Sequence, residues 1–143
     1  MTYATLTTLN AQFGAREVVA LTDRDMDGVP DQAVLDDALA AADSLIDSYI
    51  GRRYALPLAD VPKLLVTLAG TLVRYQLSGA GVTETDPTRD RYRDAIKLLE
   101  AIRDGNIHLG PDPAGDQPAQ ASAIRVTGGN RKFVAGTLDG DYL

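Results

Sequence analysis

The sequence predicts an all-α protein: a compact bundle of four to five helices with an extended carboxyl-terminal arm, which is either a β-hairpin or irregular. Three observations predict it. Apolar residues recur at helical spacing in successive segments up to about residue 110. Glycine or proline stands at the ends of these segments. Beyond residue 110 the helical spacing disappears. The 143 residues have the length of one domain.

Two short helices are expected before residue 22. Leu6, Leu9 and Phe13 fit one face of the first, and Gly14 follows as a stop signal. Residues 16–21 are apolar enough to form the second. A run rich in aspartate then separates this pair from the next helix.

The clearest helix is expected over residues 31–50. Its apolar face is formed by Leu35, Ala38, Leu39, Ala42, Leu45, Ile46 and Tyr49. Asp36, Asp43 and Asp47 lie on the opposite side, and we interpret them as a solvated face, with a binding surface as the alternative. Gly51 ends the helix.

A non-helical joint is expected after Gly51, because Pro57 and Pro62 interrupt helical structure there. Asp60 is expected to cap the following helix, which runs to about Leu77. Apolar residues cover most of its circumference, so it should be the central, buried helix. Its small residues should admit a neighbouring helix closely: Thr67, Gly70 and Thr71.

Residues 78–88 are expected to form a loop, and residues 89–104 an amphipathic helix that Gly105 ends. Opposite charges on its outer face recur three residues apart, as in Asp90 with Arg93, Arg91 with Asp94, and Glu100 with Arg103. We interpret them as surface pairs. The alternative is that Arg89, Arg91 and Arg93 contact an acidic partner.

Composition excludes several classes of function. The chain has no cysteine and one histidine, His108, and it shows none of the common catalytic motifs, so we expect no enzyme. The formal net charge of −6 disfavours binding to nucleic acid through phosphates. The amino terminus does not resemble a signal peptide, and no apolar run is long enough to span a bilayer, so we expect a soluble protein made in a cytoplasm.

The aspartate run DRDMDGVPD resembles the start of a calcium loop. Its carboxylates occupy positions 1, 3, 5 and 9 of such a loop: Asp23, Asp25, Asp27 and Asp31. Gly28 fits position 6, but Val34 stands where a bidentate glutamate is needed. A weak, structural Ca²⁺ site is one interpretation. The other is a tight turn whose last aspartate caps the next helix.

The chain changes character after residue 110. Residues 111–122 are rich in Pro, Gly and Ala, which predicts a linker. Residues 123–143 are expected to form an arm with a turn at Gly128-Gly129. A lone hairpin is marginal in water, so the arm is either disordered or completed by another surface. Candidate partner-binding residues are Arg125, Arg131, Lys132, Phe133, Tyr142 and Leu143. We take Arg131 and Phe133 as the best anchors.

The ordered phrases IDSYIGRRYALPL, VPKLLVTLAGTLVRYQL, RYRDAIKLLEAIRDGNIHLG and NRKF together resemble the Mu-like bacteriophage and prophage family of head–tail connector proteins, also called neck or adaptor proteins. The resemblance implies an all-α subunit of a ring of about twelve copies beneath the portal. It also implies a carboxyl-terminal arm that docks on the portal, a tail or stopper protein on the other side, and DNA that passes through without specific binding. The protein would then belong to the virion, at the head–tail interface.

A second function, from a different class, is a small calcium-binding helical module that uses the aspartate loop. A connector should need its arm and ignore chelators. A calcium module should lose stability in chelator and be indifferent to the arm.

Overall fold

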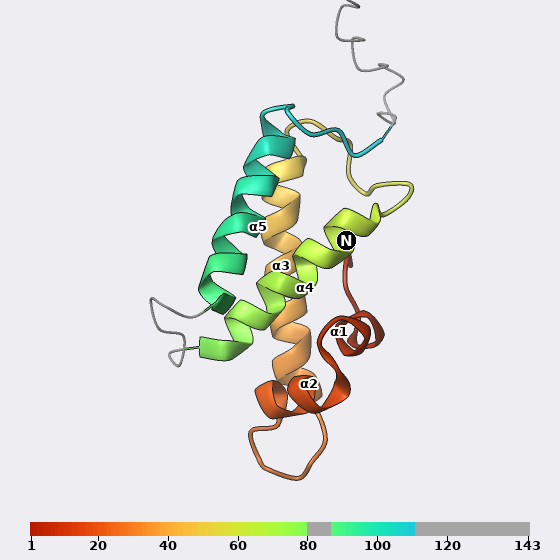
Figure 1. Ribbon diagram of the computed structural model, residues 1–143. Coiled ribbons are helices and arrows are strands. Elements are labelled where there is room, and N and C mark those ends of the chain that lie inside the picture. Colours follow the sequence, from red (N-terminus) through yellow and green to blue (C-terminus); the bar gives the residue numbers. More distant parts are fainter. Residues whose placement is uncertain (80–86, 111–143) are drawn as a thin grey trace, which may run out of the picture.

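Five α-helices form the part of the chain that the computed structural model describes, residues 1–79 and 87–110 (Figure 1). They are α1 (Leu6–Phe13), α2 (Ala15–Thr22), α3 (Gln32–Ile50), α4 (Lys63–Ser78) and α5 (Pro87–Arg103). No strand occurs in these residues. The predicted all-α class is therefore confirmed, while the predicted hairpin, linker and arm lie outside the described residues.

Helices α3 and α5 lie side by side, α4 crosses both, and α1 and α2 pack beside α4 at one end (Figure 1). Helix α4 contacts all four other helices, which confirms that it is the central one. The side chains with almost no solvent exposure come mainly from α3, α4 and α5: Leu35, Ile46, Ile50, Leu65, Leu72, Val73, Leu99 and Ile102. Burial of such side chains is the main force that holds the helices together.

Short-range signals define most helix boundaries. Thr5 and Thr8 form a reciprocal capping box at the start of α1, and Gly14, with φ of 91°, separates α1 from α2. Asp31 caps α3 through a hydrogen bond from the amide of Ala33 at 3.1 Å. The predicted cap of α4 is wrong, because Pro62 and not Asp60 occupies the position before Lys63 and makes no side-chain hydrogen bond.

The small-residue patch on α4 receives α1. The side-chain amide of Gln12 donates a hydrogen bond to the carbonyl of Thr67 at 3.2 Å. The end of the same side chain lies where a Cβ on Gly70 would stand, so a larger residue at position 70 would require it to move. This close approach confirms the expectation that a neighbour packs against the patch.

Arg74 joins α4 to the two amino-terminal helices. Its Nε lies 2.5 Å from a carboxylate oxygen of Glu17 on α2, and its guanidinium lies 5.1 Å from the ring centre of Phe13 on α1. The ion pair and the cation–π contact place one side chain against both short helices. Farther along α4, Tyr75 stacks on Tyr92 of α5 with ring centres 4.0 Å apart.

Part of the acidic face of α3 is not a solvated surface. The amide of Tyr3 donates to Asp43 at 3.0 Å, and the hydroxyl of Tyr3 donates to Asp47. Tyr3 itself is only 3% exposed. The prediction was therefore wrong for these two aspartates, which hold the segment before α1 against α3. Asp36 remains exposed, as predicted.

The pairs predicted on α5 form only in part. Arg93 lies 3.5 Å from Asp90. Asp94 instead lies 3.6 Å from Lys97, and Arg103 pairs with Asp104 at 2.8 Å. These ion pairs are exposed and contribute little to stability.

Candidate functional site

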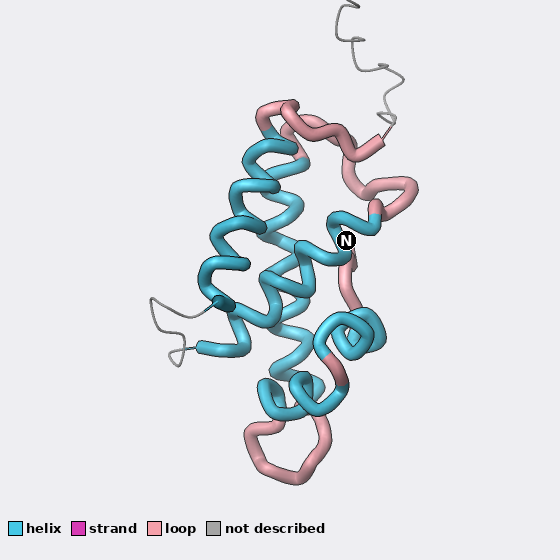
Figure 2. Tube along the Cα trace, in the orientation of Figure 1, coloured by secondary structure: helices cyan, strands magenta, loops and turns pink. Residues whose placement is uncertain are grey.

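The aspartate loop, residues 23–31, lies at one end of the molecule, and the 51–62 joint and residues 104–110 lie at the other (Figure 2). In the loop, Asp23 accepts hydrogen bonds from the amides of Asp27 at 3.1 Å and Gly28 at 2.8 Å. Asp27 accepts one from the amide of Val29 at 2.8 Å. Side-chain carboxylates thus close the turn by binding backbone amides.

Three of the four predicted calcium ligands come together. Carboxylate oxygens of Asp23, Asp25 and Asp27 lie within 4.8 Å of one another. Asp31 is not part of that cluster, because its oxygen caps α3. Desolvation raises the pKa of Asp23, but hydrogen bonds from Gly28 and Asp27 outweigh it and hold that pKa below its ordinary value. Hydrogen bonds within the loop thus favour the charged form of Asp23.

The apex of the loop presents apolar side chains to solvent. Met26 is 90% exposed and has φ of 60°, a backbone conformation uncommon outside glycine, asparagine and aspartate. Val29 is 58% exposed. The sequence did not predict the exposure of either side chain, although the carbonyl of Val29 fits position 7 of a calcium loop. A methionine between two aspartates carries no periodic signal that would reveal its exposure.

At the other end, a pocket of about 380 Å³ opens between the 51–62 joint and the last described residues. Its apolar walls are Tyr54, Leu58, Val61, Pro62 and Leu109, and Ala59 and Asp60 complete it. Sequence reasoning missed this pocket. The available signal was the phrase YALPLADVP, which holds several apolar residues that no helical face requires.

Two contacts fix residues 105–109 against the joint. The amide of Leu109 donates to the hydroxyl of Tyr54 at 3.1 Å. A guanidinium nitrogen of Arg53 donates to Nδ1 of His108 at 3.2 Å, and the same guanidinium lies where a Cβ on Gly105 would stand. His108 is exposed, as expected of a loop histidine. The chain therefore leaves the helical body at a defined place, beside the pocket.

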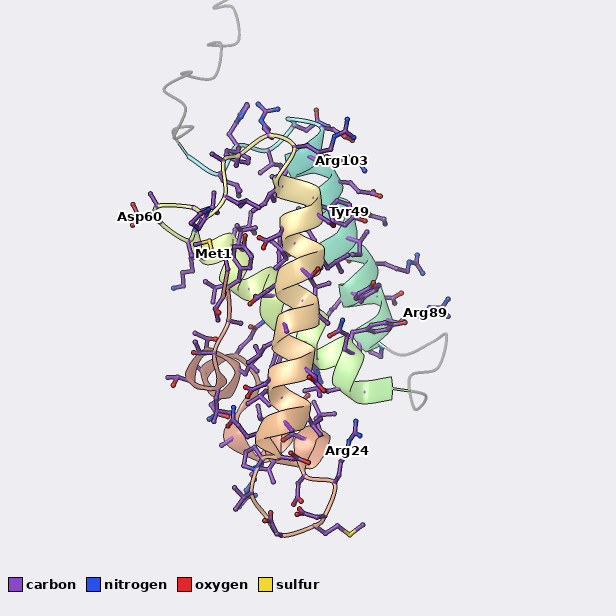
Figure 3. The ribbon with its side chains drawn as sticks, turned by 180° about the vertical axis from the view of Figure 1, so that it is seen from behind. Met1, Arg24, Tyr49, Asp60, Arg89 and Arg103 are labelled. Carbon is purple, nitrogen blue, oxygen red and sulfur yellow. The ribbon has the colours of Figure 1, made fainter. Side chains whose placement is uncertain are left out.

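Charged side chains lie at both ends of the molecule. Figure 3 shows Arg24 at the aspartate-loop end, Arg103 at the opposite end, and Asp60 projecting from the joint. The guanidinium of Arg103 lies 5.8 Å from the ring centre of Tyr49. Among the described residues, Asp60 makes no ion pair or hydrogen bond, although it lines an apolar pocket.

The predicted partner-binding residues of the arm all lie outside the described residues: Arg125, Arg131, Lys132, Phe133, Tyr142 and Leu143. Their role stays a prediction. Within the described ranges, no helix combines the length and the apolar character needed to cross a membrane.

Comparison with known proteins gives three matches. The family described as Bacteriophage Mu, Gp36 matches residues 3–127. Gene product J of Escherichia phage Mu is 37% identical over 114 residues, which cover 77% of each chain. The Mu-like prophage FluMu protein gp36 of Haemophilus influenzae is 41% identical over 80 residues, covering 56% of this chain and 55% of the relative.

Proposed function

Since the chain belongs to the bacteriophage Mu Gp36 family, we propose that it is a virion structural protein, and more narrowly a head–tail connector subunit. In this proposal the copies form a closed ring of about twelve subunits beneath the portal. The ring joins the capsid to the tail, and the protein acts by assembly and not by catalysis.

Family membership is the observation that carries the proposal. The matched region, residues 3–127, includes the helical body and continues through the predicted linker into the arm. A phage protein that consists of a small helical body and an appended segment suits an assembly role. The acidic composition, with a net charge of −6, also suits the wall of a DNA channel, because an acidic wall does not bind the phosphates of DNA.

The proposed partners follow from this arrangement. The carboxyl-terminal arm binds the portal, with Arg131 and Phe133 as anchors, because arginine and aromatic side chains dominate interface energies. Neighbouring copies contact the helical body, and a tail or stopper protein binds the opposite side of the ring. DNA passes through the ring without specific contacts.

The test is co-sedimentation of the full chain with portal rings encoded by the same phage or prophage. The Phe133→Ala and Arg131→Ala variants should bind at least tenfold more weakly, as expected for anchor residues. Thr137→Ala, in the same segment, is the matched control and should bind as the parent does. Absence of binding by the parent chain would refute the connector proposal.

The same assay separates the connector from the calcium-binding alternative. That alternative is supported by the three clustered carboxylates of the aspartate loop. A connector should sediment with the portal equally well in chelator and in calcium. A calcium module should ignore the portal and lose thermal stability in chelator.

A further inference from the structure

The pocket beside Leu109 is lined mainly by apolar side chains. Tyr54 and Leu58 are 4% and 8% exposed, so the floor of the pocket is continuous with the core. A volume of about 380 Å³ is within the range of sites that hold a small ligand or one large side chain. The surface is therefore shaped to receive something apolar.

We propose that this pocket is a docking site for the carboxyl-terminal segment of the same chain. Phe133 occupies the apolar pocket, and Arg131 and Lys132 lie next to Asp60. The proposal goes beyond the connector function and describes the free chain, because Phe133 leaves the pocket in any copy whose arm binds a portal.

The place where the chain leaves the body favours this occupant. Leu109 lines the pocket, and its amide is held by Tyr54 at 3.1 Å, so the segment starts at the edge of its own site. Between Gly110 and Phe133 there are 22 residues. A random chain of that length has a typical span of about 25 Å, which is ample for a return to the pocket. The short tether gives the segment a high effective concentration there.

Charge selects the part of the segment that docks. Asp60 lines the pocket and has no ion pair among the described residues. Phe133 directly follows the cations Arg131 and Lys132, whereas Tyr142 directly follows Asp141. A carboxylate at the pocket attracts the first group and repels the second. Phe133 is therefore the aromatic residue that fits both the apolar walls and the charge.

The test uses the full chain with Phe133→Trp, which introduces a lone tryptophan because the parent has none. Its emission should be shifted to the blue and its quenching by acrylamide should be several-fold weaker than for Tyr142→Trp, the matched control. Adding Ala59→Lys, which places a cation on the pocket wall, should return Phe133→Trp to the behaviour of the control. Ala55→Lys changes an exposed alanine of the same joint that does not line the pocket, and should have no effect.

Asp60→Asn provides a second variant that leaves the apolar walls intact. It should weaken docking and remove its dependence on salt. Circular dichroism should show the same helicity in every variant. Solvent-like emission from Phe133→Trp would overturn the proposal. So would a blue shift that persists in Ala59→Lys, or one that disappears on dilution, which would mean that a second copy supplies the segment.

Discussion

Tyr3 shows how one side chain can anchor a whole segment. Its ring is buried, its hydroxyl donates to Asp47, and its amide donates to Asp43. Burial raises the pKa of Asp43, and the hydrogen bond from Tyr3 counteracts that rise only in part. The segment before α1 is thus fixed to α3 by polar contacts that are specific to this tyrosine.

Replacing Tyr3 with phenylalanine should lower the free energy of unfolding by about 1 kcal/mol, because Asp47 loses a hydrogen bond from a buried donor. Chemical denaturation measures the change. Tyr49→Phe is the matched control, since the Tyr49 hydroxyl makes no hydrogen bond among the described residues. Equal effects of the two substitutions would contradict the assigned role of Tyr3.

The same hydroxyl makes stability depend on alkaline pH. Burial, the hydrogen bond to Asp47 and the nearby carboxylate charges raise the pKa of Tyr3 above its ordinary value. The unfolded chain, with a tyrosine pKa of about 10, then releases this proton before the folded chain does. The contribution of the protonated Tyr3 hydroxyl to the free energy of unfolding is complete below about pH 10 and is lost as the pH rises further. Thermal melts between about pH 8 and 11 should therefore fall more steeply for the parent than for Tyr3→Phe.

Two neighbouring aspartates should respond differently to substitution. Asp23→Ala removes the acceptor of two backbone amides and should lower the melting temperature by several degrees, measured in chelator. Asp25→Ala should change it little, because no backbone amide is found to donate to Asp25 within the described loop. A large, calcium-dependent effect of both substitutions would instead indicate a metal site.

Residue roles were the hardest to predict from the sequence. Helical spacing correctly places Asp43 and Asp47 opposite the apolar face of α3, yet both are covered by Tyr3 from a segment about 40 residues away. The Tyr54 hydrogen bond to Leu109 likewise joins residues that local patterns cannot relate. Such contacts depend on tertiary packing, which a local pattern does not encode.

At the scale of elements, the end of the Gln12 side chain on α1 occupies the space beside Gly70 on α4. Gly70→Leu should destabilise the fold by about 1–3 kcal/mol, because the new side chain displaces Gln12. Adding Gln12→Ala should recover part of that loss in a double-mutant cycle of denaturation curves. No coupling between the two positions would show that α1 does not dock there.

The positions of the helices were well predicted, because apolar spacing and glycine stops act locally. Gly14 separates α1 from α2, Asp31 caps α3, and the 51–62 joint is non-helical as its two prolines indicated. The start of α4 was less predictable. Both Asp60 and Pro62 are acceptable near a helix start, and only the path of the joint decides between them.

For the whole molecule, the net charge of −6 has a direct experimental consequence. The protein should not retard duplex DNA in a gel at about 50 mM salt, conditions under which basic proteins bind strongly. A variant with lysine at positions 23, 25 and 27 tests whether the acidic loop contributes to this, and should bind measurably. Retardation by the parent chain would count against a passive channel.

The hydrogen bond from Leu109 to Tyr54 also determines how the body would respond to tension on the segment that follows it. A pull on Gly110 reaches the Leu109 amide first and passes through the Tyr54 hydroxyl to a side chain buried beyond the carboxyl-terminal end of α3. We expect this contact to resist the first step of peeling α5 away from the body. Part of the load then falls on α3 as well as on α5, and these two helices pack against each other.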